Sequence, residues 1–205
     1  MEAETGSMFE PAMTFRHPVP HDAVAIWQLI RSTPPLDVNS VYLYAVLAEH
    51  FSQTCLVAEV AVAAAGIGVG AGETTTGASG AGGASDEEGG PVLAGVVTGF
   101  IPPNDPTMLF IWQLAVAEDQ RGSGVASALL RRLLAGQPRT VRFVSATVAP
   151  ENHASRGVFT RFAAHLGAPI EFRPHLAGAD LAPDGVPHPD EDLVVIGPWG
   201  REVAS

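Results

Sequence analysis

Residues 121–126, with the sequence Arg-Gly-Ser-Gly-Val-Ala, carry the clearest chemical signal in the chain. They lie between an apolar stretch and a segment of helical periodicity. Glycines let the backbone bend tightly and approach a ligand closely, and the first turn of a helix offers unpaired N–H groups at the positive end of its dipole. Such a turn can hold a pyrophosphate, although an ordinary strand-to-helix turn needs the same residues. The segment lacks the Lys of a phosphate-binding loop and the third glycine of a dinucleotide fingerprint.

Asn152 is a second candidate, because it follows the apolar segment 144–148 and directly precedes a segment of helical periodicity. Its amide could cap that helix, as asparagine often does, or reach a ligand.

Apolar periodicity predicts the elements that position these residues. The predicted strands are 14–17, 54–60, 92–101, 109–116, 141–149, 170–173 and 193–196, and the predicted helices are 21–32, 39–51, 124–135 and 154–166. Asn39 is the expected cap of the second helix, whose apolar face would carry Tyr42, Val46 and Leu47. The strand 109–116 is apolar on both faces and should be central. This order predicts an α/β sandwich around one mixed sheet.

The length of 205 residues predicts a single domain. We expect residues 1–13 to form a disordered leader, 14–198 the domain and 199–205 a tail. Residues 61–90 are rich in Gly and Ala and predict a flexible insertion within a hairpin, because such a composition buries too little surface to offset its ordering entropy.

Charge and cysteine content exclude several classes of protein. The formal net charge is -11, and all 11 cationic side chains are arginines. This balance argues against a general nucleic-acid binder and against docking on an anionic membrane, and the absence of Lys excludes Schiff-base chemistry on lysine. Cys55 is the one cysteine, and the histidines lack metal-ligand spacing, so no metal site is predicted. The acidic N-terminus does not look like a signal peptide, so the expected location is the cytoplasm.

The glycine turn and the strand–Asn–helix segment together resemble the acyl-CoA site of the GNAT acetyltransferase superfamily. The pattern Arg-x-x-Gly-x-Gly/Ala matches 121–126, and the second segment matches 144–159. The resemblance implies a GNAT-like fold with a mostly antiparallel mixed sheet, whose fourth and fifth strands splay apart around acetyl-CoA. It implies these acetyl-CoA contacts: Leu114, Val116, Arg121, Gly122, Ser123, Gly124, Val125, Ala126 and Asn152. One position departs from many members, which have a Tyr acid where this chain has Phe159.

Further segments resemble one subfamily, the L-2,4-diaminobutyrate acetyltransferases of ectoine synthesis. The segments that carry this resemblance are 34–44, 50–59, 99–103, 109–116, 147–155, 188–191 and 196–198. The match runs from about residue 14 to residue 198 and is broken by the Gly-rich insertion, which is much longer than the family's short turn. It implies a homodimer that transfers acetyl from acetyl-CoA to the γ-amine of L-2,4-diaminobutyrate.

The resemblance also implies the residues of the diamine site: Asp37, Tyr42 and Trp112 for binding, Glu191 as first candidate base and His188 as second. Carboxylates and an aromatic wall suit a diamine. Each residue also has a plain structural interpretation. Asp37 could cap a helix, Tyr42 and Trp112 could be core, and the two C-terminal residues could lie in a solvated loop.

Two other functions remain open from the sequence. One is a GNAT enzyme for another amine, such as a polyamine, an aminoglycoside or a protein N-terminus. The other is a non-catalytic acyl-CoA sensor, for which Phe159 is the one supporting residue. Arg16, Arg142 and Arg173 are candidate partners for a substrate carboxylate, although each could equally be a surface charge.

Overall fold

The computed structural model describes residues 13–61, 92–182 and 185–200. The predicted leader up to residue 12, the predicted insertion from residue 62 and the end of the predicted tail lie outside the described residues. The strands are β1 (Met13–Arg16), β2 (Leu56–Val60), β3 (Val92–Phe100), β4 (Met108–Val116), β5 (Phe143–Val148), β6 (Ile170–Leu176) and β7 (Glu191–Ile196). The α-helices are α1 (Ala23–Arg31), α2 (Val41–His50), α3 (Val125–Ala135), α4 (His153–Leu166) and α5 (Gly178–Leu181).

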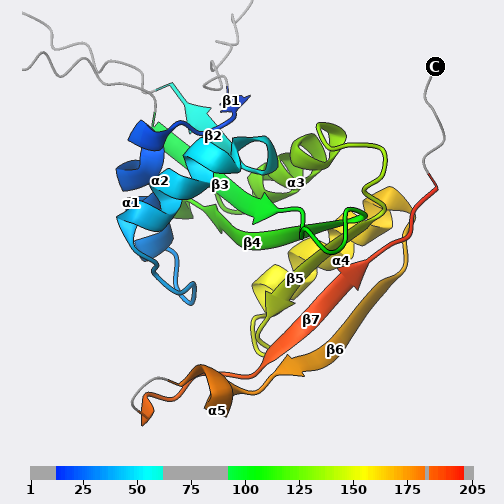
Figure 1. The fold of residues 1–205 in the computed structure, drawn as a ribbon. Helices are drawn as coiled ribbons and strands as arrows, with labels where there is room; N and C mark the ends of the chain where they lie inside the picture. The colour runs from blue at the N-terminus through cyan, green and yellow to red at the C-terminus, as the bar shows by residue number, and fades with distance from the viewer. Residues whose placement is uncertain (1–12, 62–91, 183–184, 201–205) are drawn as a thin grey trace, which may run out of the picture.

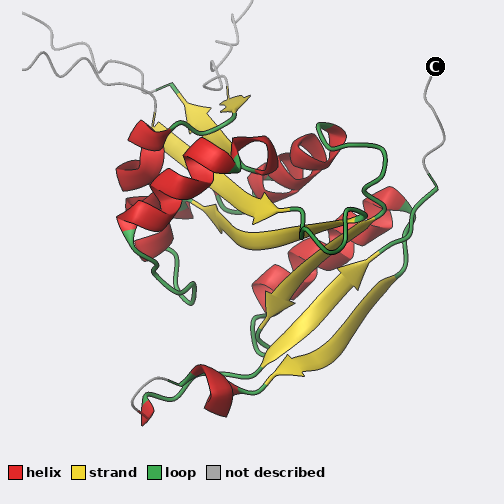
Figure 2. Cartoon of the chain, in the orientation of Figure 1, coloured by secondary structure: helices red, strands yellow, loops and turns green. Residues whose placement is uncertain are grey.

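The strands form one seven-stranded sheet in the order β1-β2-β3-β4-β5-β7-β6. Only β4 and β5 pair in parallel, and the other described pairs are antiparallel. Helices lie on both faces of the sheet, with α1 and α2 on one face over its β1–β4 part and α3 and α4 on the other (Figures 1 and 2). Helices α1 and α2 pack with Cys55, Val57 and Val96 in one hydrophobic cluster, whereas α3 and α4 belong to the other. The predicted fold class is confirmed.

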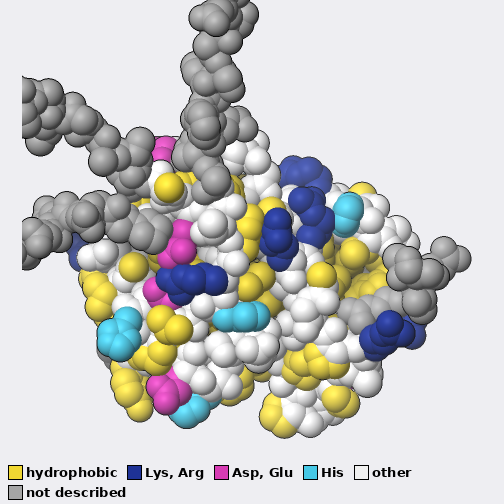
Figure 3. All heavy atoms as spheres, turned by 90° about the horizontal axis from the view of Figure 1, so that it is seen from above, with side chains coloured by type: hydrophobic (Ala, Val, Ile, Leu, Met, Phe, Trp, Pro, Cys, Tyr) yellow, Lys and Arg dark blue, Asp and Glu magenta, His cyan; other side chains and the backbone are white. Residues whose placement is uncertain are grey.

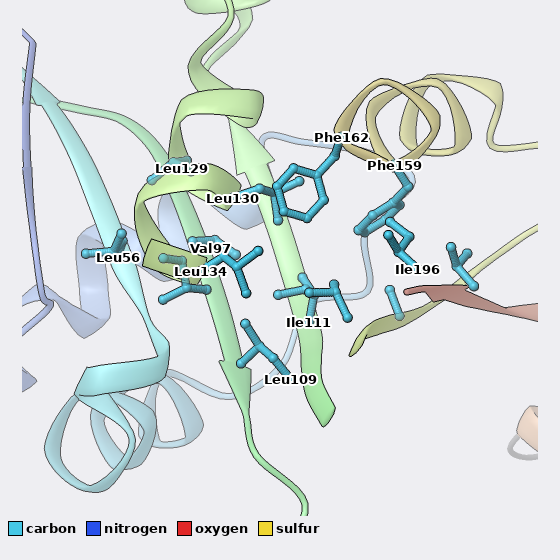
Figure 4. Packing of buried hydrophobic residues seen from close by; sticks show 14 of the residues in the cluster. Leu56, Val97, Leu109, Ile111, Leu129, Leu130, Leu134, Phe159, Phe162 and Ile196 are labelled. Carbon is cyan, nitrogen blue, oxygen red and sulfur yellow. The ribbon is translucent and has the colours of Figure 1, made fainter. Parts of the chain in front are cut away.

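The larger cluster fixes α3 and α4 relative to the central strand. Leu130 of α3 and Phe162 of α4 are each 2% exposed and belong to one cluster with Leu109 and Ile111 of β4 (Figure 4). Full burial of a side chain of this size stabilises the fold by about 1.5–3 kcal/mol. The packing therefore holds the N-terminal ends of two helices against the same side of the sheet.

The central strands diverge in the middle of the sheet, as the resemblance implies. Strand β4 pairs with β5 only over Met108–Ile111 and then continues to Val116 paired with β3 alone. A β-bulge accompanies the divergence, because Thr98 and Gly99 of β3 pair with Gln113 and Ile111, which leaves Trp112 as the extra residue of β4. The second half of β4 therefore has an edge that β5 does not cover.

Some predicted details differ from the structure. Ser40, and not Asn39, caps α2, since the Ser40 hydroxyl accepts a hydrogen bond from the Leu43 N–H at 3.3 Å. Glu191, which the sequence placed in a loop, is the first residue of β7. Trp199, placed in the tail by the sequence, is 4% exposed and packs in the larger cluster, so the packed chain extends beyond residue 198.

No helix among the described residues is long and apolar enough to span a bilayer. In the same part of the chain, no group of three or more His, Cys, Asp or Glu side chains could hold a metal ion.

Candidate active site

A cleft of about 580 Å³ lies between the unpaired end of β4 and the N-terminal turns of α3 and α4. Seven predicted acetyl-CoA residues line it: Leu114, Val116, Arg121, Gly122, Gly124, Val125 and Ala126. Segments 120–127 and 153–161 provide most of its remaining walls, and Thr33 approaches from the loop that follows α1. The structure thus brings together residues that the sequence analysis selected from separate elements.

The glycine turn has a conformation that other residues rarely adopt. Gly122 has a φ of 81° and Gly124 a φ of 90°, both in the left-handed region. A Cβ atom at either position would meet nothing within 4 Å, so the backbone conformation, and not lack of space, requires glycine here. Gly124 is the N-cap of α3 and supplies no side-chain cap. The N–H groups of the first turn precede the first helical hydrogen bond, from Ala128 to Gly124, and can therefore face an anion.

Ser123 and Asn152 support the two turns beside the cleft and are not among the described residues that line it. The Ser123 hydroxyl donates to the Gln120 carbonyl at 2.6 Å. The Asn152 side chain accepts from the Ser155 N–H at 3.1 Å and so caps α4. Both contacts are those expected of plain turn and cap residues.

Two arginines, Arg121 and Arg161, lie at the cleft. Guanidinium groups bind phosphate oxygens through charge-assisted hydrogen bonds, and two helix N-termini add positive potential. On the face shown in Figure 3, some arginine side chains gather away from the acidic ones, whereas others lie singly, one of them beside acidic side chains. The cleft therefore suits a ligand with several phosphate groups.

A second group of predicted residues comes together from opposite ends of the chain. His188 Nε2 lies 3.2 Å from Asp37 Oδ2, and His188 Nδ1 lies 2.7 Å from the Pro189 carbonyl oxygen. Both ring nitrogens thus face acceptors, which favours the doubly protonated imidazolium. The pKa of His188 is raised, first by the Pro189 carbonyl and then by the Asp37 carboxylate. An imidazolium held in this way has no nitrogen free to accept a proton.

Glu191, at the start of β7, interacts electrostatically with both His188 and Asp37, and we call these three residues the acidic cluster. The Glu191 side chain is half-buried, and loss of solvation raises the pKa of its carboxyl. The His188 charge lowers that pKa, whereas the Asp37 charge raises it. A carboxylate whose pKa is moved toward neutrality is a better proton acceptor than an ordinary surface carboxylate.

Trp112 and Tyr42 are both exposed. Trp112 is 46% exposed at the β4 bulge and lies 6.3 Å, ring centre to ring centre, from Phe100. Its aromatic surface is thus open to a ligand. Tyr42 is 77% exposed on α2, and among the described residues no hydrogen bond or ring contact joins it to the acidic cluster.

Two buried polar residues, Tyr44 and Gln113, were not predicted as site residues from the sequence. The Tyr44 hydroxyl donates to Gln113 Oε1 at 3.0 Å, and Gln113 Nε2 donates to the Asp37 carbonyl at 2.7 Å. One signal could have pointed to Gln113, since an amide inside the apolar strand 109–116 needs a hydrogen-bond partner.

The remaining residues considered as an acid or as partners of the substrate carboxylate are mostly buried or bonded to other groups of the protein. Phe159 is 4% exposed in the larger hydrophobic cluster and has no polar atom on its side chain to serve as an acid. Arg16 bonds the carboxylates of Asp22 and Glu59, at 2.7 and 2.6 Å, and so ties β1 to β2. Arg142 donates to the Trp199 carbonyl at 3.2 Å. Two of the three arginines considered for a substrate carboxylate thus have structural partners.

Comparison with known proteins gives the family that the motifs resemble. Residues 74–164 match the model of the acetyltransferase (GNAT) family. The chain is 35% identical to the L-2,4-diaminobutyric acid acetyltransferase of Chromohalobacter salexigens, over 90% of this chain and 80% of that protein. It is also 35% identical to the protein of the same name from Bordetella parapertussis, over 94% and 90% of the two chains.

A solved structure is also similar over nearly the whole chain. It is the diaminobutyrate acetyltransferase EctA from Paenibacillus lautus, in complex with its substrate L-2,4-diaminobutyric acid and coenzyme A. The TM-score is 0.73 and the identity 33%, covering 95% of this chain and 99% of that one. The resemblance inferred from the motifs is therefore confirmed, and the chain belongs to the L-2,4-diaminobutyric acid acetyltransferase family of the GNAT acetyltransferases.

Proposed function

We propose that this protein transfers the acetyl group of acetyl-CoA to the γ-amine of L-2,4-diaminobutyrate. The product would be N4-acetyl-L-2,4-diaminobutyrate, the precursor of ectoine. The observation that carries the proposal is the Asp37–His188–Glu191 cluster next to a phosphate-binding cleft. The two sites adjoin on β4, because Leu114 lines the cleft while its neighbour Gln113 bonds the Asp37 carbonyl.

Acetyl-CoA would bind in the cleft with its pyrophosphate against the glycine turn and the first turn of α3. Arg121 and Arg161 would add charge-assisted contacts to phosphate oxygens. The thioester would then extend along the edge of β4 that β5 leaves uncovered after Ile111. A backbone N–H of the segment 114–116 would stabilise the oxyanion as the carbonyl is attacked.

The diamine arrives with protonated amines, since an unperturbed side-chain amine has a pKa of roughly 10. Asp37 would bind an ammonium group, and Glu191 would accept a proton from the γ-ammonium, directly or through water. Glu191 is favoured over His188 because the imidazolium, with acceptors at both nitrogens, has no lone pair to offer. Trp112 would provide an aromatic wall for the cationic substrate.

The reaction then needs no further acid. The γ-nitrogen attacks the thioester carbon and forms a tetrahedral intermediate, which releases the second proton of its nitrogen to solvent. The intermediate then collapses to the amide as the carbon–sulfur bond breaks. The leaving thiolate is stable enough to depart unprotonated, because thiols have a pKa near 8.5. The presence of Phe159 in place of a Tyr acid is compatible with this step.

Regioselectivity would come from positioning. The α-amine is the less basic nitrogen, so its reactive free-base fraction at neutral pH is larger. Selective γ-acetylation therefore requires a site that fixes the α-ammonium away from the thioester.

The test is thiol release from acetyl-CoA with L-2,4-diaminobutyrate, compared with lysine, ornithine, spermidine and a peptide N-terminus. The position of the acetyl group is determined by NMR. We expect turnover on diaminobutyrate, with acetyl on the γ-nitrogen. Turnover on another amine alone would refute the substrate, and coenzyme A binding without turnover on any amine would favour the sensor.

We further propose that the protein acts in the cytoplasm as a homodimer. The family resemblance supports both expectations, and exposed apolar side chains on α2, among them Val41 and Tyr42, are available for an interface. Light scattering during size-exclusion chromatography would test the dimer, since a monomer mass at micromolar concentration would contradict it.

A further inference from the structure

Two buried polar side chains connect the loop that carries Asp37 to the strand that lines the cleft. Tyr44 is 1% exposed and Gln113 is 6% exposed. They belong to α2 and β4, and neither lines the described cleft. We call the segment 33–40, between α1 and α2, the Asp37 loop.

The hydrogen bonds form one continuous chain. The Asn39 N–H donates to the Tyr44 hydroxyl at 3.3 Å, and that hydroxyl donates to Gln113 Oε1 at 3.0 Å. Gln113 Nε2 then donates to the Asp37 carbonyl at 2.7 Å. Two backbone groups of the Asp37 loop are thus bound to a pair of side chains that are shielded from water, where such bonds are costly to lose.

The β4 bulge makes this arrangement possible. Side chains alternate along a strand, so without the bulge Gln113 would face the same side as Ile111, which packs in the larger hydrophobic cluster. The extra residue, Trp112, instead turns Gln113 toward α2. The next residue, Leu114, lines the cleft. The bulge therefore places the anchor of the Asp37 loop one residue before the acetyl-CoA site.

The Asp37 loop itself lies between the two sites. Thr33, at its start, lines the cleft, and the Asp37 carboxylate lies 3.2 Å from His188. The Asp37 side chain is 78% exposed and bonds no other described side chain, so its position depends on the backbone that carries it. That backbone is what Gln113 and Tyr44 hold.

We propose that Tyr44 and Gln113 are positioning residues, which hold Asp37 at a fixed place relative to the thioester and thereby select the γ-amine over the α-amine. The inference rests on the proposed function, in which Asp37 binds a substrate ammonium group. A displacement of this anion would let the diamine bind less tightly and in more than one orientation, and a small misplacement of this kind is sufficient to lower selectivity.

The chain offers a matched control for the loss of a buried amide. Gln137 is 7% exposed, and its Nε2 donates to the Gln53 carbonyl at 2.8 Å and to the Leu133 carbonyl at 3.0 Å. It thus holds a loop backbone as Gln113 does, but not the loop that carries Asp37. Gln113→Met and Gln137→Met each remove a buried side-chain amide, and we expect them to lower the free energy of unfolding by similar amounts.

The experiment compares Gln113→Met, Tyr44→Phe and Gln137→Met with the unchanged protein. The readouts are KM for each substrate, kcat, the ratio of γ- to α-acetylated product by NMR, the Tm, and hydrogen exchange of the amides in segment 33–40. We expect Gln113→Met to raise KM for diaminobutyrate about tenfold, and Tyr44→Phe about threefold, because each hydrogen bond contributes a modest net amount. Both should form α-acetylated product and exchange faster in the Asp37 loop, with KM for acetyl-CoA unchanged.

Gln137→Met should lower the Tm while both KM values and the product ratio stay as they were. The proposal is overturned if Gln113→Met changes neither the diamine KM nor the product ratio, or if Gln137→Met changes them equally. Should Gln113→Met not fold, Tyr44→Phe, which loses one hydroxyl, decides by the same criteria. If the unchanged protein does not acetylate diaminobutyrate, the proposed function fails and this proposal with it, an outcome distinct from failure of the variants alone.

Discussion

Glu191 and His188 lie three residues apart, and the pKa of each is raised for a different reason. His188 gains the Pro189 carbonyl and the Asp37 carboxylate as partners, which stabilise its charged form. Glu191 loses solvation, which destabilises its charged form. The pair therefore combines an imidazole whose protonated form is stabilised with a carboxylate that accepts protons more readily than usual. This difference favours Glu191 over His188 as the proposed base.

The variant Glu191→Gln tests that assignment. We expect kcat to fall about 100-fold or more, the usual contribution of a general base, while KM for acetyl-CoA changes little. The matched control is Glu171→Gln, which neutralises an exposed carboxylate on β6 and should leave kcat unchanged. Initial rates of thiol release measure both. If the Glu191→Gln variant had a normal kcat, a group other than Glu191 would have to be the base.

The same residue predicts a pH dependence. A carboxyl whose folded pKa lies above its unfolded value binds more protons when folded, so its contribution to stability is lost as pH rises from about 4.5 through the folded pKa. Glu191→Gln should therefore raise the Tm relative to the unchanged protein at pH 7 and not at pH 4. In the unchanged enzyme, kcat should rise with pH through the pKa of Glu191. Thermal melts and pH–rate profiles measure these effects, and a lower Tm for Glu191→Gln at pH 7 would contradict the desolvation argument.

At the scale of elements, the N-terminus of α3 combines two requirements. Its turn needs left-handed glycines, and its first N–H groups must stay free of side-chain caps to meet an anion. Residues 121–126 alone predicted a tight glycine turn followed by free N–H groups, because glycine spacing before a helix is a local signal, and the structure adds the left-handed φ values. The sequence also predicted the seven strands and helices α1 to α4, since their apolar periodicity is local too, but it did not predict the four-residue helix α5.

Gly124→Ala tests the role of this turn. A φ of 90° is unfavourable for alanine, and we expect a destabilisation of about 1–2 kcal/mol. KM for acetyl-CoA should rise about tenfold, equivalent to roughly 1.4 kcal/mol of lost binding, with KM for diaminobutyrate unchanged.

Gly136→Ala is the control at the other end of α3, because Gly136 has a φ of -79° and its nearest contact would be an ordinary 3.6 Å. Calorimetry and initial rates compare the two variants. An unchanged KM for acetyl-CoA in Gly124→Ala would mean that the turn does not hold the pyrophosphate.

The buried face of helix α2 could not be predicted from apolar periodicity. The residues of this helix are apolar on every side until Glu49, so spacing alone did not identify the face that packs on the sheet. Tyr42, which the sequence placed on that face, is 77% exposed, and Tyr44 is buried instead. The direction of the Gln113 side chain could not be predicted from the sequence either. The β4 bulge changes the alternation of side chains along the strand and has no sequence signal of its own.

At the scale of the whole molecule, the diamine site depends on contacts that no local pattern contains. Asp37 and His188 are 151 positions apart in the sequence. Asp37 lies in the Asp37 loop and His188 in the segment before β7, and their side chains are in contact. Family resemblance grouped these residues, and the fold brings Asp37 and His188 into contact. The composition contributed exclusions only, since a net charge of -11 says nothing of where Arg121 and Arg161 lie.

The proposed function requires that one fold hold two adjoining sites with separate tasks, an anion-binding cleft for acetyl-CoA and an acidic cluster for the diamine. The most direct test is Asp37→Ala, measured as initial rates over a matrix of both substrate concentrations. We predict that KM for diaminobutyrate rises about tenfold or more, the value of a hydrogen bond to a charged group, while KM for acetyl-CoA is unchanged. An unchanged KM for the diamine, or an equal loss for both substrates, would contradict the account.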